Sequence, residues 1–228
     1  MKYAIVHVND RAIKNINYNK CILGENEYLD DIEYFDGNIN NGWNEINRLG
    51  ISTETWKPYD GRNFGPLPGE YGVWISTIRA LQYMVDNKID TMLLLEDDIT
   101  LLDDFVQKLE LCVNDLPNDF DFLSLFCAEE QNTLDSTTDI GSLYIHRSKK
   151  QFAGALAMLY SLKGAKKILK IAKRFGMEYT SDCFIYHYSH TNILNGYSIQ
   201  NNSITMLINN DYEIKSLIDP SNIRHGKR

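Results

Sequence analysis

Three consecutive carboxylates stand at the end of a strongly apolar run in this sequence. Glu96, Asp97 and Asp98 directly follow the segment 91–95, which has the length and composition of a buried strand. Side chains alternate along a strand, so Glu96 and Asp98 are expected on one side and Asp97 on the other. Two carboxylates on one side of a strand end suit Mg²⁺ or Mn²⁺, which prefer oxygen ligands. The run predicts a divalent metal site, with a solvated acidic turn as the alternative.

The elements around this strand must place its end at a ligand-binding edge. Strands are expected at 3–8, 20–23, 32–35, 91–95, 120–126, 142–145 and 154–160, and helices at 71–87, 103–114 and 161–173. From residue 177 on, short strands are expected, including a tyrosine-rich segment that carries His187 and His190. The alternation predicts a Rossmann-like α/β/α sandwich around a mostly parallel central sheet. Such sheets bind ligands at the carboxyl ends of their strands, which is where the acidic run lies.

Composition limits the class of protein further. The 228 residues are 43% hydrophobic and 24% charged, which is typical of one soluble globular domain. The net charge of -8 argues against a broad electrostatic grip on nucleic acid. The four cysteines form no closely spaced pair, so a reducing, cytoplasmic location is predicted. No secretion signal is evident, and no apolar run is long enough for a transmembrane helix.

A series of motifs surrounds the acidic run in a specific order. A helix containing Gly72 and Ser76 precedes it, and a strand at 121–125 follows it. The remaining matching positions are Gly154, Ala157, Ser161, Gly164, Ala165 and Asp182. This order resembles glycosyltransferase family 25, which includes lipooligosaccharide and collagen galactosyltransferases. Thr77 departs from the family pattern, which usually has His at this place, and the chain is short for a separate acceptor module.

The resemblance implies a single glycosyltransferase domain of GT-A type over residues 1–228. Its first half, 1–100, would bind the nucleotide sugar, and 101–228 would form the acceptor side and a C-terminal tail. The cofactor would be Mn²⁺ or Mg²⁺, and the donor a nucleoside-diphosphate sugar such as a UDP-hexose. The expected reaction moves a hexose or pentose to an acceptor hydroxyl with inversion.

The resemblance also implies roles for individual residues. Asp182 would take the proton of the acceptor hydroxyl, with Glu129 and Glu130 as rival bases. Glu96 and Asp98 would bind the metal, and His225 would add a late histidine ligand. The positions assigned to the nucleotide sugar are Asn9, Asp10, Arg11, Asp36, Ser76, Asp97 and Lys227. Simple structural roles stay open for these residues: helix or loop caps, an Asp-Gly turn at Asp36, and an ordinary basic chain end.

Three other functions remain open from the sequence. The chain could be a catalytically inactive GT-A protein that binds a saccharide or a partner. A nucleotidyl- or phosphoryl-transfer enzyme would also use paired carboxylates, but no Gly-rich phosphate-binding loop is present. The third is a glycosyltransferase acting on hydroxymethylated DNA bases. A local basic groove of Lys149, Lys150, Lys166 and Lys167 would serve such a nucleic acid acceptor, which the net charge disfavours.

Overall fold

The computed structural model describes residues 1–6, 13–24, 44, 46–57, 68–97, 99–125, 145–147, 156–199 and 205–207. At its centre is a six-stranded sheet. In spatial order its strands are β1 (Lys2–Val6), β2 (Thr91–Glu96), β6 (Ala157–Ser161), β4 (Phe122–Ser124), β7 (Gly196–Ile199) and β5 (Ile145–Arg147). Strands β1, β2, β4 and β7 point the same way, while β6 and β5 run against them.

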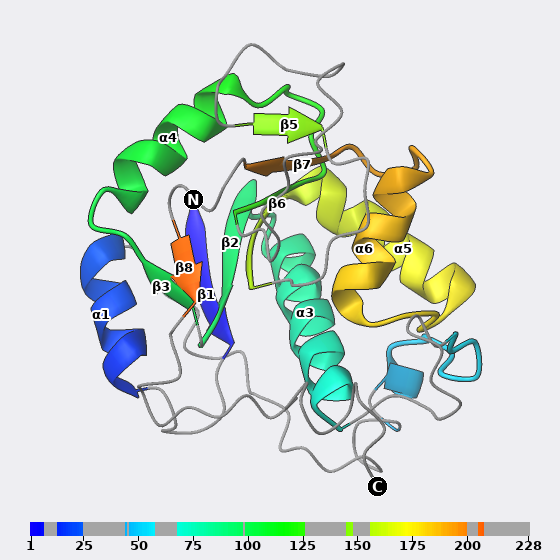
Figure 1. Ribbon diagram of the computed structural model, residues 1–228. Helices are drawn as coiled ribbons and strands as arrows, with labels where there is room; N and C mark the ends of the chain where they lie inside the picture. Colours follow the sequence, from blue (N-terminus) through cyan, green and yellow to red (C-terminus); the bar gives the residue numbers. More distant parts are fainter. Residues whose placement is uncertain are drawn as a thin grey trace, which may run out of the picture.

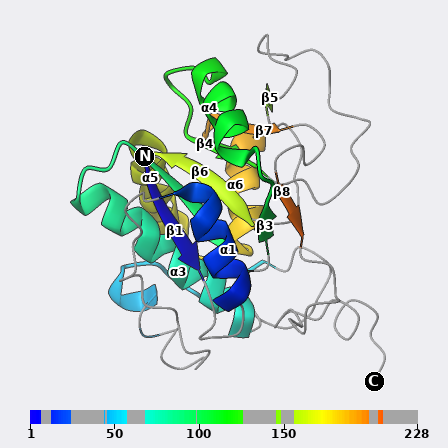
Figure 2. The ribbon, with the colours of Figure 1, turned by 90° about the vertical axis from the view of Figure 1, so that its left-hand side faces the viewer.

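Two layers cover the sheet, one on each face (Figure 1). One layer consists of α3 (Pro68–Asp86), α5 (Leu162–Phe175) and α6 (Ser181–His190). The other consists of α1 (Ile13–Leu23), α4 (Phe105–Asp115) and the antiparallel pair β3 (Ile99–Leu101) and β8 (Thr205–Leu207). Figure 2 views the second layer with α1 in front. The predicted α/β/α sandwich is therefore confirmed. Within the described ranges, no helix combines the length and the apolar character that a membrane crossing requires.

Strand β2 is buried on both faces, which explains its unbroken run of apolar residues. Met92 and Leu94 belong to the core under α3, α5 and α6. Leu93 and Leu95 belong to the core on the other side, under α1 and α4. Because both faces are packed, a shift of β2 by one residue would exchange the two sets of side chains. The position of the strand end at Glu96 is fixed by this packing.

Helix α1 occupies residues 20–23, where the sequence predicted a strand, so that prediction is wrong. The buried positions of this helix lie three or four residues apart: Ile16, Asn19 and Leu23. The side chain of Asn19 donates a hydrogen bond to a backbone carbonyl of β3 (2.7 Å) and accepts one from a backbone amide of β3 (3.0 Å). A polar residue in the middle of the buried stripe interrupts the apolar pattern by which the helix would be recognised.

Helix α6 replaces the strand-like segment predicted around His187 and His190, so this prediction is also wrong. Seven of its ten residues are buried: Ser181, Cys183, Phe184, Ile185, Tyr186, Tyr188 and Ser189. A helix that is buried on nearly all sides shows no one-sided apolar stripe. Its aromatic and β-branched residues are also typical of strands. The expected strand at 32–35 lies outside the described residues.

The first turn of α5 lies directly against the start of β4. Ser161 caps the helix, because its Oγ accepts a hydrogen bond from the Gly164 amide at 3.0 Å. A Cβ atom at Gly164 would lie only 1.9 Å from the backbone oxygen of Asp121. Two of the motif positions that suggested a family resemblance, Ser161 and Gly164, therefore have a structural role.

Gly164→Ala should destabilise the protein by about 3 kcal/mol or more, since the added methyl group can be accommodated only by moving α5 away from β4. Urea denaturation measures the effect. Lys163→Ala is the matched control, because Lys163 is exposed on the same helical turn, and its change should stay within about 0.5 kcal/mol. Equal midpoints for Gly164→Ala and the wild type would contradict the close approach.

Candidate functional site

Glu96 is the last residue of β2 and lies at the carboxyl edge of the sheet. The backbone amide of Glu96 donates to the carbonyl of Leu156 at 2.8 Å, which fixes the strand end beside the start of β6. Glu96 itself is half-buried. By alternation its side chain lies on the same face as Met92 and Leu94, toward α3, α5 and α6. Asp97 is only 4% exposed, as expected for a residue turned into the domain.

Helix α6 brings Asp182 to this same edge. The helix leads into β7, whose first residue, Gly196, pairs with Phe122 at the start of β4. The end of α6 therefore lies at the amino edge of the sheet, and its first turn, with Asp182, lies toward the carboxyl edge. The Oδ1 atom of Asp182 accepts a hydrogen bond from the Cys183 amide at 2.8 Å. An acidic residue suits this position, because the positive end of the helix dipole is there.

A buried phenol, Tyr160, lies within electrostatic reach of both Glu96 and Asp182. Burial raises the pKa of the Tyr160 hydroxyl, and the neighbouring Tyr186, Glu96 and Asp182 raise it further. Tyr160 is fully buried, and its hydroxyl has no hydrogen-bond partner within the described part of the chain. The hydroxyl of Tyr186, by contrast, donates to the Ser124 Oγ at 2.8 Å. Tyr160 therefore stays protonated, and its side chain belongs to the core under α3, α5 and α6.

Glu70 adds a third carboxylate to this region. It lies in the first turn of α3 and is 7% exposed. The pKa of the Cys183 thiol is raised to about 12, mainly by burial and then by Asp182, with a smaller contribution from Glu70. Glu70 and Tyr160 were not among the site residues predicted from the sequence. An acid in a first helical turn was a signal for Glu70, whereas Tyr160 had none.

The buried Glu178 links α6 to the segment 51–57. One carboxylate oxygen is 2.5 Å from the Lys57 Nζ, and the other accepts a hydrogen bond from the Tyr188 hydroxyl at 2.6 Å. The amide of Lys57 also donates to the Glu178 carbonyl at 2.6 Å. Next to these contacts, Trp74 of α3 donates through its Nε1 to the carbonyl of Tyr179 at 2.6 Å. These bonds tie α6 to α3 and to the segment 51–57.

The pKa of Glu178 reflects this environment. Burial alone would raise the pKa, but hydrogen bonds from Lys57 and Tyr188 and the charges of Lys57 and His187 lower it below its ordinary value. A carboxyl group with a lowered pKa in the folded state stabilises the protein above its unfolded-state pKa. That stabilisation is lost as the pH falls through the folded-state pKa.

The other sequence-predicted site residues are only partly described. Ser76 lies on α3, is 1% exposed, and its Oγ has no hydrogen-bond partner among the described residues. Glu96, Asp97 and Asp182 are placed as given above. The predicted site residues outside the described ranges are Asn9, Asp10, Arg11, Asp36, Asp98, His225 and Lys227, and the rival bases Glu129 and Glu130 lie there too. The described part therefore places Glu96 and Asp182 toward the same edge of the sheet and leaves the metal-binding, catalytic and nucleotide-binding assignments as predictions.

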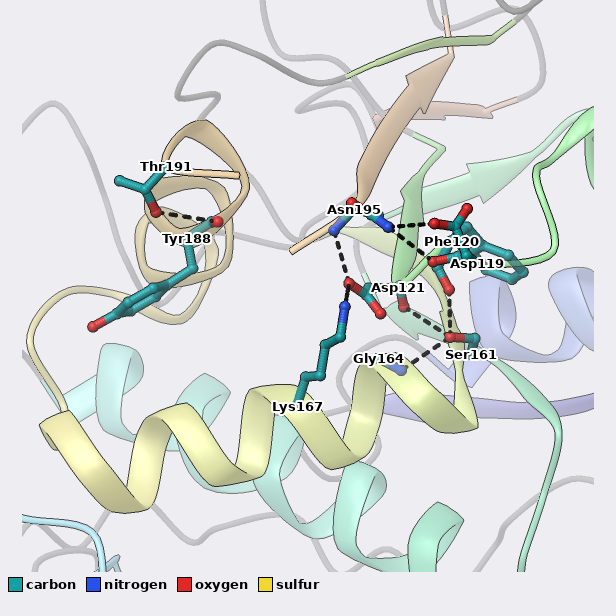
Figure 3. Close-up of polar contacts among 9 residues, drawn as sticks. All are labelled: Asp119, Phe120, Asp121, Ser161, Gly164, Lys167, Tyr188, Thr191 and Asn195. Atoms are coloured by element: carbon teal, nitrogen blue, oxygen red, sulfur yellow. Dashed lines mark hydrogen bonds and ion pairs between the residues drawn. The ribbon is translucent and has the colours of Figure 1, made fainter. Parts of the chain in front are cut away.

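Lys167 does not belong to a free basic groove, contrary to one sequence interpretation. Its Nζ lies 2.5 Å from the Oδ2 of Asp121, which is fully buried. The same oxygen accepts a hydrogen bond from the Asn195 amide at 2.7 Å, and Figure 3 shows both groups converging on it. Asp121 precedes β4, so this cluster braces the amino edge of the sheet, away from Glu96. Lys149 and Lys150 lie outside the described residues.

A comparison with known protein families supports the family that the order of motifs suggested. The sequence model of glycosyltransferase family 25 (LPS biosynthesis protein) matches residues 55–221, which is more than half of the chain. The crystal structure of A197 from STIV is similar with a TM-score of 0.42 and 13% identity, covering 87% of this chain and 81% of that chain. For mouse xyloside xylosyltransferase 1 in its apo form the TM-score is 0.37 and the identity 10%, over 84% of this chain and 81% of that one. The search of curated proteins found no match. With TM-scores this low, the family assignment depends on the sequence match.

Glu178→Gln should lower the free energy of unfolding at pH 7 by about 1.5–3 kcal/mol, because it removes a charged acceptor of two hydrogen bonds. Its deficit relative to the wild type should shrink as the pH is lowered toward 3, where the wild-type carboxyl also becomes protonated. Urea denaturation over this pH range measures both effects, with the exposed Glu54→Gln as control. A deficit that does not vary with pH would contradict the lowered pKa.

Tyr160→Phe and Tyr186→Phe each remove a phenolic hydroxyl group, and only the second change should lower stability. Tyr160→Phe should leave the free energy of unfolding unchanged or raise it by up to about 1 kcal/mol, since it removes a buried hydroxyl without a described partner. Tyr186→Phe should lower it by about 1 kcal/mol, because it breaks the bond to Ser124. The denaturant midpoints of the two variants measure these changes in stability. A larger loss for Tyr160→Phe than for Tyr186→Phe would mean that the Tyr160 hydroxyl has a partner.

Proposed function

The chain belongs to glycosyltransferase family 25, and we propose that it transfers a hexose or pentose from a nucleoside-diphosphate sugar, expected to be a UDP-hexose, to an acceptor hydroxyl. Its α/β/α sandwich agrees with the GT-A type that the resemblance implies. The observation that supports the proposal most is the position of Glu96 at the carboxyl end of the buried strand β2, the edge toward which the first turn of α6 carries Asp182. These two groups come from opposite halves of the sequence, the proposed donor half 1–100 and acceptor half 101–228 of one domain.

Mn²⁺ or Mg²⁺ is part of this proposal, and the chemistry of the strand end fits such an ion. Glu96 is a half-buried carboxylate at the end of a rigid strand, and oxygen is the ligand type that both cations prefer. Among the described residues no group of three or more His, Cys, Asp or Glu side chains is close enough to bind a metal alone. We propose Asp98 as the second ligand and His225 as a third. A bound cation would neutralise charge on the departing diphosphate.

Asp182 is the proposed general base. An ionised carboxylate in the first turn of α6 would accept the proton of the acceptor hydroxyl while the hydroxyl oxygen attacks the sugar carbon from the face opposite the diphosphate. That geometry gives inversion. Ser76, Asp97 and the undescribed Asn9, Asp10, Arg11, Asp36 and Lys227 remain proposed contacts of the nucleotide sugar.

The proposed acceptor is a saccharide, in keeping with the family's description as an LPS biosynthesis protein. A DNA-base acceptor is less well supported, because Lys167 of the predicted basic groove is bound to Asp121. A cytoplasmic location is also part of the proposal. The described cysteines Cys21, Cys112 and Cys183 are free thiols, as a reducing compartment would keep them.

Asp98→Asn should abolish metal-dependent release of nucleoside diphosphate, and Asp182→Asn should lower kcat by about 10²–10⁴-fold, the usual contribution of a general base. The two substitutions should affect different kinetic steps. Asp98→Asn should weaken donor binding, whereas Asp182→Asn should leave the KM for the donor nearly unchanged. A screen of nucleotide sugars with saccharide acceptors, read out as nucleoside diphosphate release, provides the assay.

Asp115→Asn is the matched control, since Asp115 is an exposed acid at the end of α4 in the opposite layer. It should retain wild-type kcat and KM. Full activity of Asp98→Asn would show that the metal assignment is wrong. Full activity of Asp182→Asn would transfer the role of base to another group, with Glu129 and Glu130 the first to test.

A further inference from the structure

Helix α5 has an unusual charge distribution on its outer side. Its 14 residues contain six of the chain's 23 basic residues and no acidic residue. The six are Lys163, Lys166, Lys167, Lys170, Lys173 and Arg174. All except the half-buried Lys167 are exposed. This concentration of positive charge lies on a chain whose net charge is -8.

The six cations form one continuous face, here called the basic face. At about 100° per residue, their positions fall within an arc of about 120° around the helix axis. The opposite side of α5 is the buried side, formed by Gly164, Ala165, Ile168, Leu169, Ile171 and Ala172. From Lys163 to Arg174 the basic face extends about 16 Å along the helix. It is therefore a narrow, convex stripe of charge on the surface of the molecule.

Most of this charge is not compensated by the described residues. Lys167 pairs with Asp121, as Figure 3 shows. The other five cations form no ion pair with any residue in the described part of the chain. Arg174 lies over the ring of Phe175, 5.1 Å from its centre. Like charges three or four residues apart on a helix repel each other, so this arrangement opposes helix stability. A partner with negative charge would relieve the repulsion.

We propose that the basic face of α5 docks the protein on the surface of an anionic lipid membrane. Five of its six cations are lysines, whose compact, hydrated charges suit the diffuse negative layer above anionic headgroups. Next to the face, the apolar side chains of Phe175 and Ile193 are 38% and 48% exposed. Both adjoin Tyr188: Phe175 stacks on its ring, and the Ile193 amide donates to its carbonyl. Exposed apolar groups beside cations are what enters the headgroup region of a bilayer.

The chemistry of the basic face fits lipid better than nucleic acid. Proteins that bind single strands place aromatic residues between the cations of a groove, where bases stack. Readers of duplex DNA present Arg, Asn or Gln to the base edges. Between Lys163 and Arg174 there is no aromatic residue and no Asn or Gln. The exposed aromatic Phe175 lies at the end of the stripe.

If the proposed function holds, docking through α5 would also bring the membrane close to the acceptor side of the site. Residues 176–180 join α5 to the first turn of α6, where Asp182 lies. A membrane that binds the basic face would therefore lie close to the proposed acceptor side. A lipid-linked acceptor in that membrane would then be close to Asp182.

Sedimentation with lipid vesicles tests the docking surface without any transfer reaction, so its result is independent of the proposed function. The full-length protein should sediment with vesicles of phosphatidylcholine and phosphatidylglycerol and stay in solution with phosphatidylcholine alone. The triple variant Lys166→Glu/Lys170→Glu/Lys173→Glu should lower the partition coefficient by roughly 100-fold. High salt should weaken wild-type binding in the same direction, because it screens the charges.

The matched control is Lys14→Glu/Lys20→Glu/Lys108→Glu, which makes the same change in net charge on α1 and α4, in the layer on the opposite face of the sheet. It should bind anionic vesicles within about threefold of the wild type. Thermal unfolding checks that each variant is folded. If the α5 triple variant is unfolded, the milder variant Lys166→Gln/Lys170→Gln/Lys173→Gln replaces it. Failure of the wild type to bind anionic vesicles, or equal loss in both triple variants, would overturn the proposal. So would binding to a DNA duplex in preference to anionic vesicles.

Discussion

The pairing of β6 is the constraint on which the site depends. This strand runs antiparallel between β2 and β4, and Leu159 lies opposite both Leu93 and Leu123. In the sheet order, β6 is the connection between the parallel pair β1–β2 and the parallel pair β4–β7. Glu96 belongs to the first pair, and Asp182 is joined through α6 to the second. The register of β6 therefore fixes how the strand end at Glu96 lies relative to α6, and it places Tyr160 opposite Met92 and Phe122.

Buried polar groups of the central sheet differ in how they are satisfied. At the amino edge, the Oδ2 atom of Asp121 is held by Lys167 and Asn195, and the first turn of α5 closes over the backbone of Asp121. The other carboxylate oxygen of Asp121 and the hydroxyl of Tyr160 are buried without a partner within the described residues. Leaving such a group unsatisfied costs about 1–3 kcal/mol, so the two packed cores must offset it. Proteins commonly tolerate such a cost where a ligand will complete the bonding.

Much of this arrangement could be predicted from the sequence, where local patterns are strong. The apolar run of β2, the one-sided pattern of α5 and the acidic strand end were recognisable without a structure. Helix α6 was not, because burial on nearly all sides removes the periodicity that identifies a helix. Helix α1 was not recognised either, because the amide side chain of Asn19 interrupts the apolar pattern of its buried side. Tyr160 could not be identified from the sequence, since its electrostatic interaction with Glu96 and Asp182 depends on strand register and helix packing. Asp182 itself was found through the family resemblance rather than through any local pattern.

The central claim is that the strand end at Glu96 binds a divalent cation together with the donor nucleotide. Calorimetric titration of UDP into the purified protein, with and without Mn²⁺, tests it most directly. Wild-type protein should bind UDP strongly only when Mn²⁺ is present, and Glu96→Gln should lose this dependence because one anionic ligand is gone. If UDP binds equally well with and without Mn²⁺, or if Glu96→Gln binds it as the wild type does, the claim is contradicted.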